Sequence, residues 1–288
     1  MIITRTPFRI SMFGGGTDYP GWYREHGGAV LSTTIDKYCY INARYLPPFF
    51  EHQFRVVYSQ IESTNKIEDI EHPSVRATLN FLKLQRGVEI HHDGDLPARS
   101  GMGSSSSFTV GLLNALHALK GHMATKEQLA NESITIEQDI LKENVGSQDQ
   151  VNAAYGGFNH ITFHASGEIS VRPVIIPPDR QDELTSHLML FYTGIKRTAD
   201  KVAGTYVNSL EAKRRELRIL RDMVEEALSI LCGHGPIKEF GELLHEGWLA
   251  KQAISDKISN PAIAELYNAA RESGAIGGKI TGAGGGGF

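Results

Sequence analysis

The sequence has few of the features that mark secreted, membrane-spanning or disulfide-rich proteins. Its 288 residues include two cysteines, Cys39 and Cys232, which form no Cys-x-x-Cys pair and cannot build a disulfide framework. We therefore expect a reducing, cytoplasmic environment. The N-terminus lacks the apolar core of a signal peptide, and no apolar run approaches the length of a membrane span. The sequence predicts no membrane partner.

A large excess of one charge is also missing. The 29 Lys and Arg residues stand against 33 Asp and Glu residues, which gives a formal net charge of -4. This balance indicates no nucleic-acid partner, so any phosphate recognition must be local. The hydrophobic fraction of 41% and the charged fraction of 22% are those of a globular protein, and the length suits one large domain or two ordinary ones. The oligomeric state is left open.

Glycine, in contrast, is concentrated in three segments that lie far apart in the chain. They are residues 7–18 (PFRISMFGGGTD), 96–107 (LPARSGMGSSSS) and 277–288 (GGKITGAGGGGF). Glycine allows positive φ angles and lets a ligand approach the main chain closely. Three such segments therefore predict one site that is assembled from distant parts of the sequence.

The middle segment has the clearest physical interpretation. It runs directly into a pattern that predicts an amphipathic helix over 104–119, and a helix N-terminus with free N–H groups binds anions. We expect a phosphate there rather than a merely flexible turn. The run lacks the Gly-Lys-Ser/Thr ending of a Walker A loop. The pattern Gly282-x-Gly284-x-x-Gly287 has no following helix, so it does not indicate a Rossmann dinucleotide site.

Residue patterns predict a mixture of strands and helices. Expected strands cover 2–4, 28–35, 38–43, 88–92 and a buried run at 187–192. Expected helices cover 104–119, 126–141, about 205–231 and about 261–273. Thr125 is the expected N-cap of the second helix, with Gln128 at the capping-box position. Prolines 173, 177 and 178 indicate a domain linker, so we expect a two-domain α+β protein.

The three glycine-rich segments, in this order, resemble the motifs of the GHMP small-molecule kinases, which include galactokinase, homoserine kinase, mevalonate kinase and phosphomevalonate kinase. Residues 6–40 and 145–158 are most similar to those of bacterial D-glycero-D-manno-heptose 7-phosphate kinases. The resemblance implies a ribosomal S5 domain 2-like domain over 1–180 and a ferredoxin-like C-terminal domain over 181–288. Members of the family continue for roughly another strand, helix and strand, so we expect the second domain to be truncated.

The resemblance also implies ATP and Mg²⁺ as cofactors. In the family the middle loop wraps the ATP phosphates, and the positions matching it here are Pro97, Ser100, Gly101, Gly103, Ser104, Ser105 and Ser106. A loop hydroxyl and a helical glutamate hold the metal, which points to Ser105, with Ser104 close behind, and to Glu137. A hydroxyl and a carboxylate are ligands that suit Mg²⁺. Taken alone, Glu137 would be read as part of a solvated helix face.

By the same resemblance, Asp149 matches the active-site aspartate, and Arg9 lies where the family carries Arg or Lys. Such a carboxylate can orient the acceptor hydroxyl or take its proton. The implied sugar-binding residues are Asp18, Gly15, Gly16, Thr17 and Gly284. Gly15 stands where galactokinases have a glutamate, and this loss suits a larger, anionic substrate tail. Cations for a distal phosphate would come from Arg24, His26, Lys37, Arg99, Lys196 or Arg197, and Lys279 and Thr281 are expected to reach the site.

The implied reaction is ATP-dependent phosphorylation of the anomeric (C1) hydroxyl of D-glycero-D-manno-heptose 7-phosphate, which would feed nucleotide-activated heptose synthesis. One alternative is another anomeric kinase, acting on fucose, galactose or an amino sugar. A second is a non-catalytic sugar sensor on the same fold, against which the intact Ser105, Glu137 and Asp149 argue. A decarboxylase of the same superfamily has no support from the sugar-type first segment.

Overall fold

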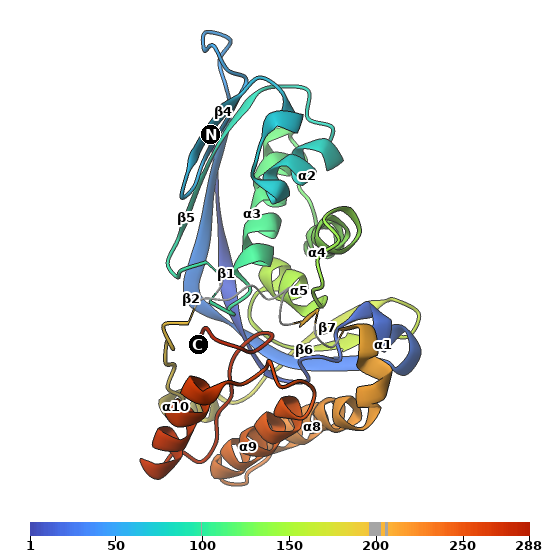
Figure 1. The fold of residues 1–288 in the computed structure, drawn as a ribbon, viewed down its shortest axis with the longest axis vertical. Coiled ribbons are helices and arrows are strands. Elements are labelled where there is room, and N and C mark those ends of the chain that lie inside the picture. Colours follow the sequence, from blue (N-terminus) through green and yellow to red (C-terminus); the bar gives the residue numbers. More distant parts are fainter. Residues whose placement is uncertain (99, 196–202, 205–206) are drawn as a thin grey trace.

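The computed structural model describes residues 1–98, 100–195, 203–204 and 207–288. A mixed sheet forms its centre, with strand order β4-β3-β5-β2-β6-β7 and β1 paired to β2 (Figure 1). The strands are β1 (Ile2–Phe13), β2 (Gly28–Tyr45), β3 (Phe54–Val57), β4 (Ile61–Thr64), β5 (Val88–Gly94), β6 (Phe158–Phe163) and β7 (Ile169–Pro173). The predicted α+β class is confirmed.

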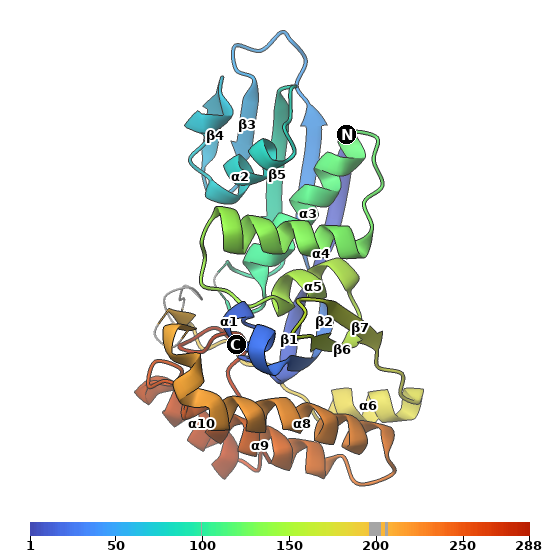
Figure 2. The ribbon, with the colours of Figure 1, turned by 90° about the vertical axis from the view of Figure 1, so that its right-hand side faces the viewer.

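Helices surround this sheet in two groups. α2 (Pro73–Phe81), α3 (Ser104–Leu119), α4 (Lys126–Ile134) and α5 (Gln148–Tyr155) lie together on one face of the sheet, to its right in Figure 1. α8 (Arg214–Cys232), α9 (Lys238–Gln252) and α10 (Pro261–Glu272) gather at the opposite end of the molecule from α2 (Figure 2). The remaining elements are α1 (Pro20–His26), α6 (Pro178–Ser186), the 3₁₀ turns η1 (Ile67–Asp69) and η3 (Val207–Lys213), and the π-helical η2 (Thr135–Ile140).

The long hairpin of β1 and β2 joins the two groups of helices. β2 pairs with β1 along most of its length, from Ala43 opposite Ile2 to Leu31 opposite Phe13. One half of β2 also pairs with β5, and the other half pairs with β6. The β1–β2 register is irregular around Arg9 and Ser11, and irregularities of this kind often occur beside active sites.

Two hydrophobic clusters hold the helices against this hairpin. In one, the apolar side of α3 packs on the sheet, where Leu112, Leu116 and Ile41 are fully buried. In the other, Trp22, Val224 and Trp248 are buried between the start of β2, α8 and α9. Burying a large apolar side chain contributes about 1.5–3 kcal/mol, so these clusters dominate the stability of the fold.

Several local predictions are confirmed. β1, β2 and β5 contain the expected strands, α3 covers 104–119, and α10 covers nearly all of 261–273. Thr125 caps α4 by accepting a hydrogen bond from the Gln128 N–H at 3.1 Å. The helix expected over 126–141 is α-helical only to Ile134 and continues as η2. Of the helix expected from 205, residues 205–206 lie outside the described residues, and the described part is η3 followed by α8.

The buried strand predicted at 187–192 is wrong. These residues form no regular structure, and Met189 and Phe191 are 79% and 61% exposed. An apolar run becomes a buried strand only when another strand pairs with it, and the described residues supply none beside this segment. The described residues between 174 and 288 form helices and loops without strands. None of the described helices is long and apolar enough to cross a membrane.

Gly14, in the first glycine-rich segment, provides a test of how closely that segment packs against β2. Its φ is +82°, and an added Cβ would lie 1.9 Å from the carbonyl oxygen of Ala29. Gly121 has a similar φ of +76° but meets nothing within 4 Å, so it is the matched control. We expect Gly121→Ala to lower the free energy of unfolding by about 1–2 kcal/mol, the cost of left-handed backbone. Gly14→Ala should lower it considerably more in urea denaturation. Equal losses would contradict this packing.

Candidate active site

A cavity of about 860 Å³ lies where the three glycine-rich segments meet. Most of the sequence-predicted site residues line it: Arg9, Gly15, Gly16, Asp18, Gly101, Gly103, Ser104, Ser105, Ser106, Glu137 and Asp149. Gly282 of the third segment lines it as well. Pro97, Thr17, Ser100 and Gly284 do not line it, and Thr17 and Ser100 are fully buried. The chain therefore brings residues from both of its ends and from its middle to one place.

A bidentate ion pair lies in the wall of this cavity. Nε and Nη2 of Arg9, on β1, donate to the two carboxylate oxygens of Asp149, on α5, at 2.7 Å each. Nη1 of Arg9 donates to the carbonyl of Gly101 at 2.7 Å. The Arg9 side chain is 4% exposed, whereas that of Asp149 is 28% exposed. The guanidinium thus fixes the orientation of a carboxylate that remains accessible from the cavity.

Asp18 is a second carboxylate in the wall, and it is buried. Its oxygens accept hydrogen bonds from the Gly16 N–H at 3.0 Å and from the Gln148 N–H at 3.2 Å. Burial raises the pKa of Asp18, and the nearby Asp149 raises it further, while the two backbone hydrogen bonds oppose this shift. A Cβ at Gly146 would lie 2.0 Å from the Asp18 carboxylate, so the approach of this side chain requires glycine.

The middle segment forms the loop at the N-terminus of α3. Gly101 and Gly103 have φ angles of +80° and +75°, and Gly103 is the N-cap residue of the helix. The first N–H groups of a helix of this length point out of its end, and together with the helix dipole they form an anion site. The third segment packs against this loop, because a Cβ at Gly287 would lie 2.0 Å from the Ser100 carbonyl oxygen.

Glu137 lies on η2 and has a chemically unusual setting. It is 1% exposed, and it accepts hydrogen bonds from Ser106 at 2.8 Å and from Gln150 at 2.6 Å. Burial raises the pKa of Glu137 to about 8. The hydroxyl beside it belongs to Ser106, whereas Ser105, the predicted metal ligand, is exposed. A buried carboxylate with a neighbouring hydroxyl fits Mg²⁺, and a bound cation would favour the ionised form of Glu137.

Lys279 and Thr281 lie behind the cavity wall rather than in it. Nζ of Lys279 donates to the main-chain carbonyls of Ser11 at 3.0 Å and Met12 at 2.9 Å. Burial lowers the pKa of Lys279 to about 7, and the positive charge of Arg9 contributes to this shift. Thr281 donates to the Phe288 carbonyl at 3.1 Å. Lys279 therefore ties the third segment to β1.

Sequence reasoning missed two groups of lining residues. The first is Tyr58, His72, His92 and Phe108, and the second is Lys251, Ile254 and Ile258. The His72 ring stacks on Phe108 with a centroid separation of 4.8 Å. Burial lowers the pKa of His72 and that of His92, so both rings are neutral at pH 7. Lys251 is buried at the C-terminal end of α9. The apolar spacing of Phe240, Leu243 and Trp248 could have revealed α9, but not where it packs.

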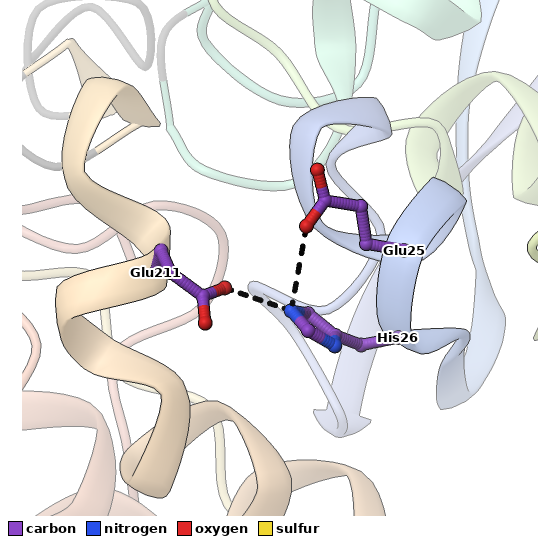
Figure 3. A group of neighbouring side chains, drawn as sticks. All are labelled: Glu25, His26 and Glu211. Carbon is purple, nitrogen blue, oxygen red and sulfur yellow. Dashed lines mark hydrogen bonds and ion pairs between the residues drawn. The ribbon is translucent and has the colours of Figure 1, made fainter.

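Among the predicted phosphate-binding cations, Arg24, His26 and Lys37 do not line the cavity, and Arg99, Lys196 and Arg197 lie outside the described residues. His26 interacts with two glutamates instead (Figure 3). Its Nε2 is 2.8 Å from an oxygen of Glu211 and 3.8 Å from one of Glu25. The hydrogen bond with His26 lowers the pKa of Glu211. The two carboxylates make this surface cluster unsuitable for a phosphate.

Comparisons with known proteins agree with this arrangement. The GHMP kinase N-terminal domain profile matches residues 73–157, and the GHMP kinase C-terminal profile matches residues 214–288. A D-glycero-α-D-manno-heptose 7-phosphate kinase of Campylobacter jejuni is 28% identical, across 100% of this chain and 88% of the relative. An L-fucokinase/L-fucose-1-P guanylyltransferase of Bacteroides fragilis is 25% identical, across 99% of this chain and 34% of that protein.

A solved structure also matches the fold. The D-glycero-D-manno-heptose 1-phosphate kinase of Bacteroides thetaiotaomicron superposes with a TM-score of 0.78 and 23% identity, across 99% of this chain and 86% of that one. At this identity the likeness establishes the fold. With both domain profiles matched in order and three glycine-rich segments meeting at one cavity, this chain belongs to the GHMP kinase family and is an ATP-dependent kinase.

Proposed function

We propose that this sugar kinase transfers the γ-phosphoryl group of ATP to the anomeric (C1) hydroxyl of D-glycero-D-manno-heptose 7-phosphate and forms the 1,7-bisphosphate. The observation that carries the proposal is the Arg9–Asp149 pair, which lies between the loop of α3 and Asp18. A Cβ at Gly103 would lie 3.6 Å from an Asp149 carboxylate oxygen, so the phosphate loop touches the pair. Asp18 interacts with the pair through charge, since the negative charge of Asp149 raises the pKa of Asp18.

We divide the residues that line the cavity into two sides. On one side, Tyr58, His72, His92 and Phe108 adjoin the phosphate loop and suit a flat, hydrophobic base. On the other side are Gly15, Gly16, Asp18, Lys251 and Ile254, where a Cβ at Gly16 would lie 3.9 Å from Ile254 Cδ1. We assign ATP to the first side and the sugar to the second, with the reacting atoms near Asp149.

Catalysis in this arrangement depends on positioning and charge. Asp149 accepts the hydrogen bond of the acceptor hydroxyl and orients it, taking its proton as phosphoryl transfer advances. Arg9 holds the carboxylate in place and supplies positive charge near the transferring group. We propose that Glu137, with the hydroxyl of Ser105 or Ser106, holds the Mg²⁺ that neutralises phosphate charge. The remaining contributions to catalysis are the exclusion of water and the alignment of the two substrates.

Lys251 is the residue we assign to the distal phosphate of the sugar. It is 6% exposed, and Nζ donates to the carbonyl of Gly282 and, at 3.4 Å, to that of Ile280. These contacts fix the ammonium group at the junction of α9 and the third glycine-rich segment, both of which line the cavity. A phosphate held in such a place gains from a charge-assisted hydrogen bond.

The substrate assignment is tested by measuring ATP consumption with Mg²⁺ and a panel of sugars. D-glycero-D-manno-heptose 7-phosphate should support turnover far better than unphosphorylated heptose, fucose or galactose. The similarity to a fucokinase makes fucose the main competitor. Turnover on a neutral sugar alone would overturn the substrate assignment but keep the kinase. Tight ATP binding without turnover on any sugar would favour a sensor.

Replacing Asp149 by asparagine should lower kcat by about 10²- to 10⁴-fold, because the amide cannot accept the proton of the sugar hydroxyl. ATP binding, followed by calorimetry, should be retained, since Asp149 lies between the two sides of the cavity. Asp139→Asn, a matched change at an exposed position of η2, should leave kcat unchanged. Near-normal turnover of Asp149→Asn would rule out its catalytic assignment.

Replacing Lys251 by methionine should raise KM for the phosphorylated sugar about 10- to 100-fold, the effect of losing a hydrogen bond to a charged group. KM for a neutral sugar should change little, and Lys251→Arg should restore part of the loss. Lys238→Met is the control on the same helix, because the Lys238 side chain is 64% exposed and pairs with Glu242. Equal losses on phosphorylated and neutral sugars, at an unchanged melting temperature, would disprove the assignment.

A further inference from the structure

Two polar atoms on the sugar side of the cavity are buried without a hydrogen-bond partner among the residues that the structure describes. They are Oγ of Ser11 and Oε1 of Gln148. Ser11 is 3% exposed and Gln148 is 8% exposed, and both residues line the cavity. Folded proteins pair nearly all buried polar groups, because an unpaired one keeps its full desolvation penalty. These two atoms therefore point to a ligand that supplies the missing hydrogen bonds.

Both side chains adjoin the same gap, which Gly15 leaves open. A Cβ built on Gly15 would lie 3.5 Å from Ser11 Oγ and 3.6 Å from Gln148 Nε2. The backbone of Gly15 is not in the left-handed region, so its conformation does not itself require glycine. The absence of a side chain instead leaves room for a ligand atom between Ser11 and Gln148.

This gap is next to Asp18. The residues on either side of it, Gly16 and Gln148, donate their backbone N–H groups to the two oxygens of the Asp18 carboxylate. A sugar that reaches Asp18 is therefore close to Ser11 and Gln148 as well. The three side chains come from β1, from the turn after β1 and from the start of α5, so they are fixed by different elements.

The chemistry of the gap selects the kind of group that fits it. A serine hydroxyl both donates and accepts, and the side-chain amide of Gln148 donates through Nε2, which adjoins the gap, and accepts through the unpaired Oε1. A group that satisfies both side chains must therefore be able to donate as well as accept. A sugar hydroxyl does both, whereas a fully ionised phosphate oxygen only accepts, leaves the Gln148 oxygen unpaired and faces the Asp18 carboxylate, so the anionic tail expected beside Gly15 from the sequence does not fit this gap.

We propose that Ser11, Gly15 and Gln148 form a subsite that binds one hydroxyl group of the sugar and contributes to the choice of substrate. The inference rests on the sugar-kinase function proposed above, but not on the identity of the sugar. Ser11 and Gln148 are specificity residues here, distinct from the Arg9–Asp149 pair and from Lys251. In the absence of sugar their unpaired atoms lower the stability of the protein.

The test uses Ser11→Ala and Gln148→Met, measured with whichever sugar the wild-type enzyme uses best. Each change should raise KM for that sugar about tenfold and leave KM for ATP within about twofold, because one hydrogen bond is lost on the sugar side only. Without ligand, the melting temperature of Ser11→Ala should be equal to or above that of the wild type. Ser259→Ala is the control, since its Oγ is also buried and unpartnered but Ser259 does not line the cavity.

A deoxy-sugar series identifies the hydroxyl that is bound. One analogue of the series should be bound equally well by wild type and by Ser11→Ala, and it is the one that lacks the hydroxyl held by Ser11, because the interaction that the substitution removes is then already absent. An active wild type with an unchanged sugar KM in both variants would overturn the subsite and leave the proposed function standing. A stable wild type that phosphorylates no sugar would overturn both together.

Discussion

The Arg9–Asp149 ion pair is the interaction on which the geometry of the site depends. It joins β1 to α5, and through the carbonyl of Gly101 it also holds the loop that begins α3. A buried ion pair contributes little net stability, because desolvation of both groups offsets their attraction. Its effect is on geometry, because the planar guanidinium can donate to both carboxylate oxygens in only one orientation of the carboxylate. The pair thus fixes the positions of the loop before α3, the Asp149 carboxylate and the first glycine-rich segment relative to one another.

Around this pair the site contains ionisable groups whose uncharged forms are favoured by burial. Burial raises the pKa values of Asp18 and Glu137 and lowers that of Lys279 to about 7. The charges of these groups therefore respond to what is bound beside them, since a cation favours an ionised carboxylate. Perturbed groups of this kind are typical of functional sites, where binding energy is used to set charge and orientation.

Local signals in the sequence predicted much of this structure. α3 and the Thr125 cap follow from residues a few positions apart, and the three glycine-rich segments indicated the cavity. Contacts between distant elements could not be predicted in this way. Lys251 reaches the cavity only because α9 packs beside the first segment. Ser106 rather than Ser105 hydrogen-bonds to Glu137, a contact that depends on how α3 and η2 pack together. The wrong prediction at 187–192 has the same origin, because an apolar run does not reveal whether another strand pairs with it.

The hydrogen bonds of Lys279 have a consequence for how the protein is made. They join residues separated by 267 and 268 positions in the chain, so the cavity closes across almost the whole sequence. Contacts of such long range form late, because the entropy of closing a large loop must be overcome first. During synthesis the β1–β2 hairpin and α3 emerge from the ribosome long before residues 277–288. A nascent chain can therefore bury the hydrophobic cluster between α3 and the sheet before the cavity is complete.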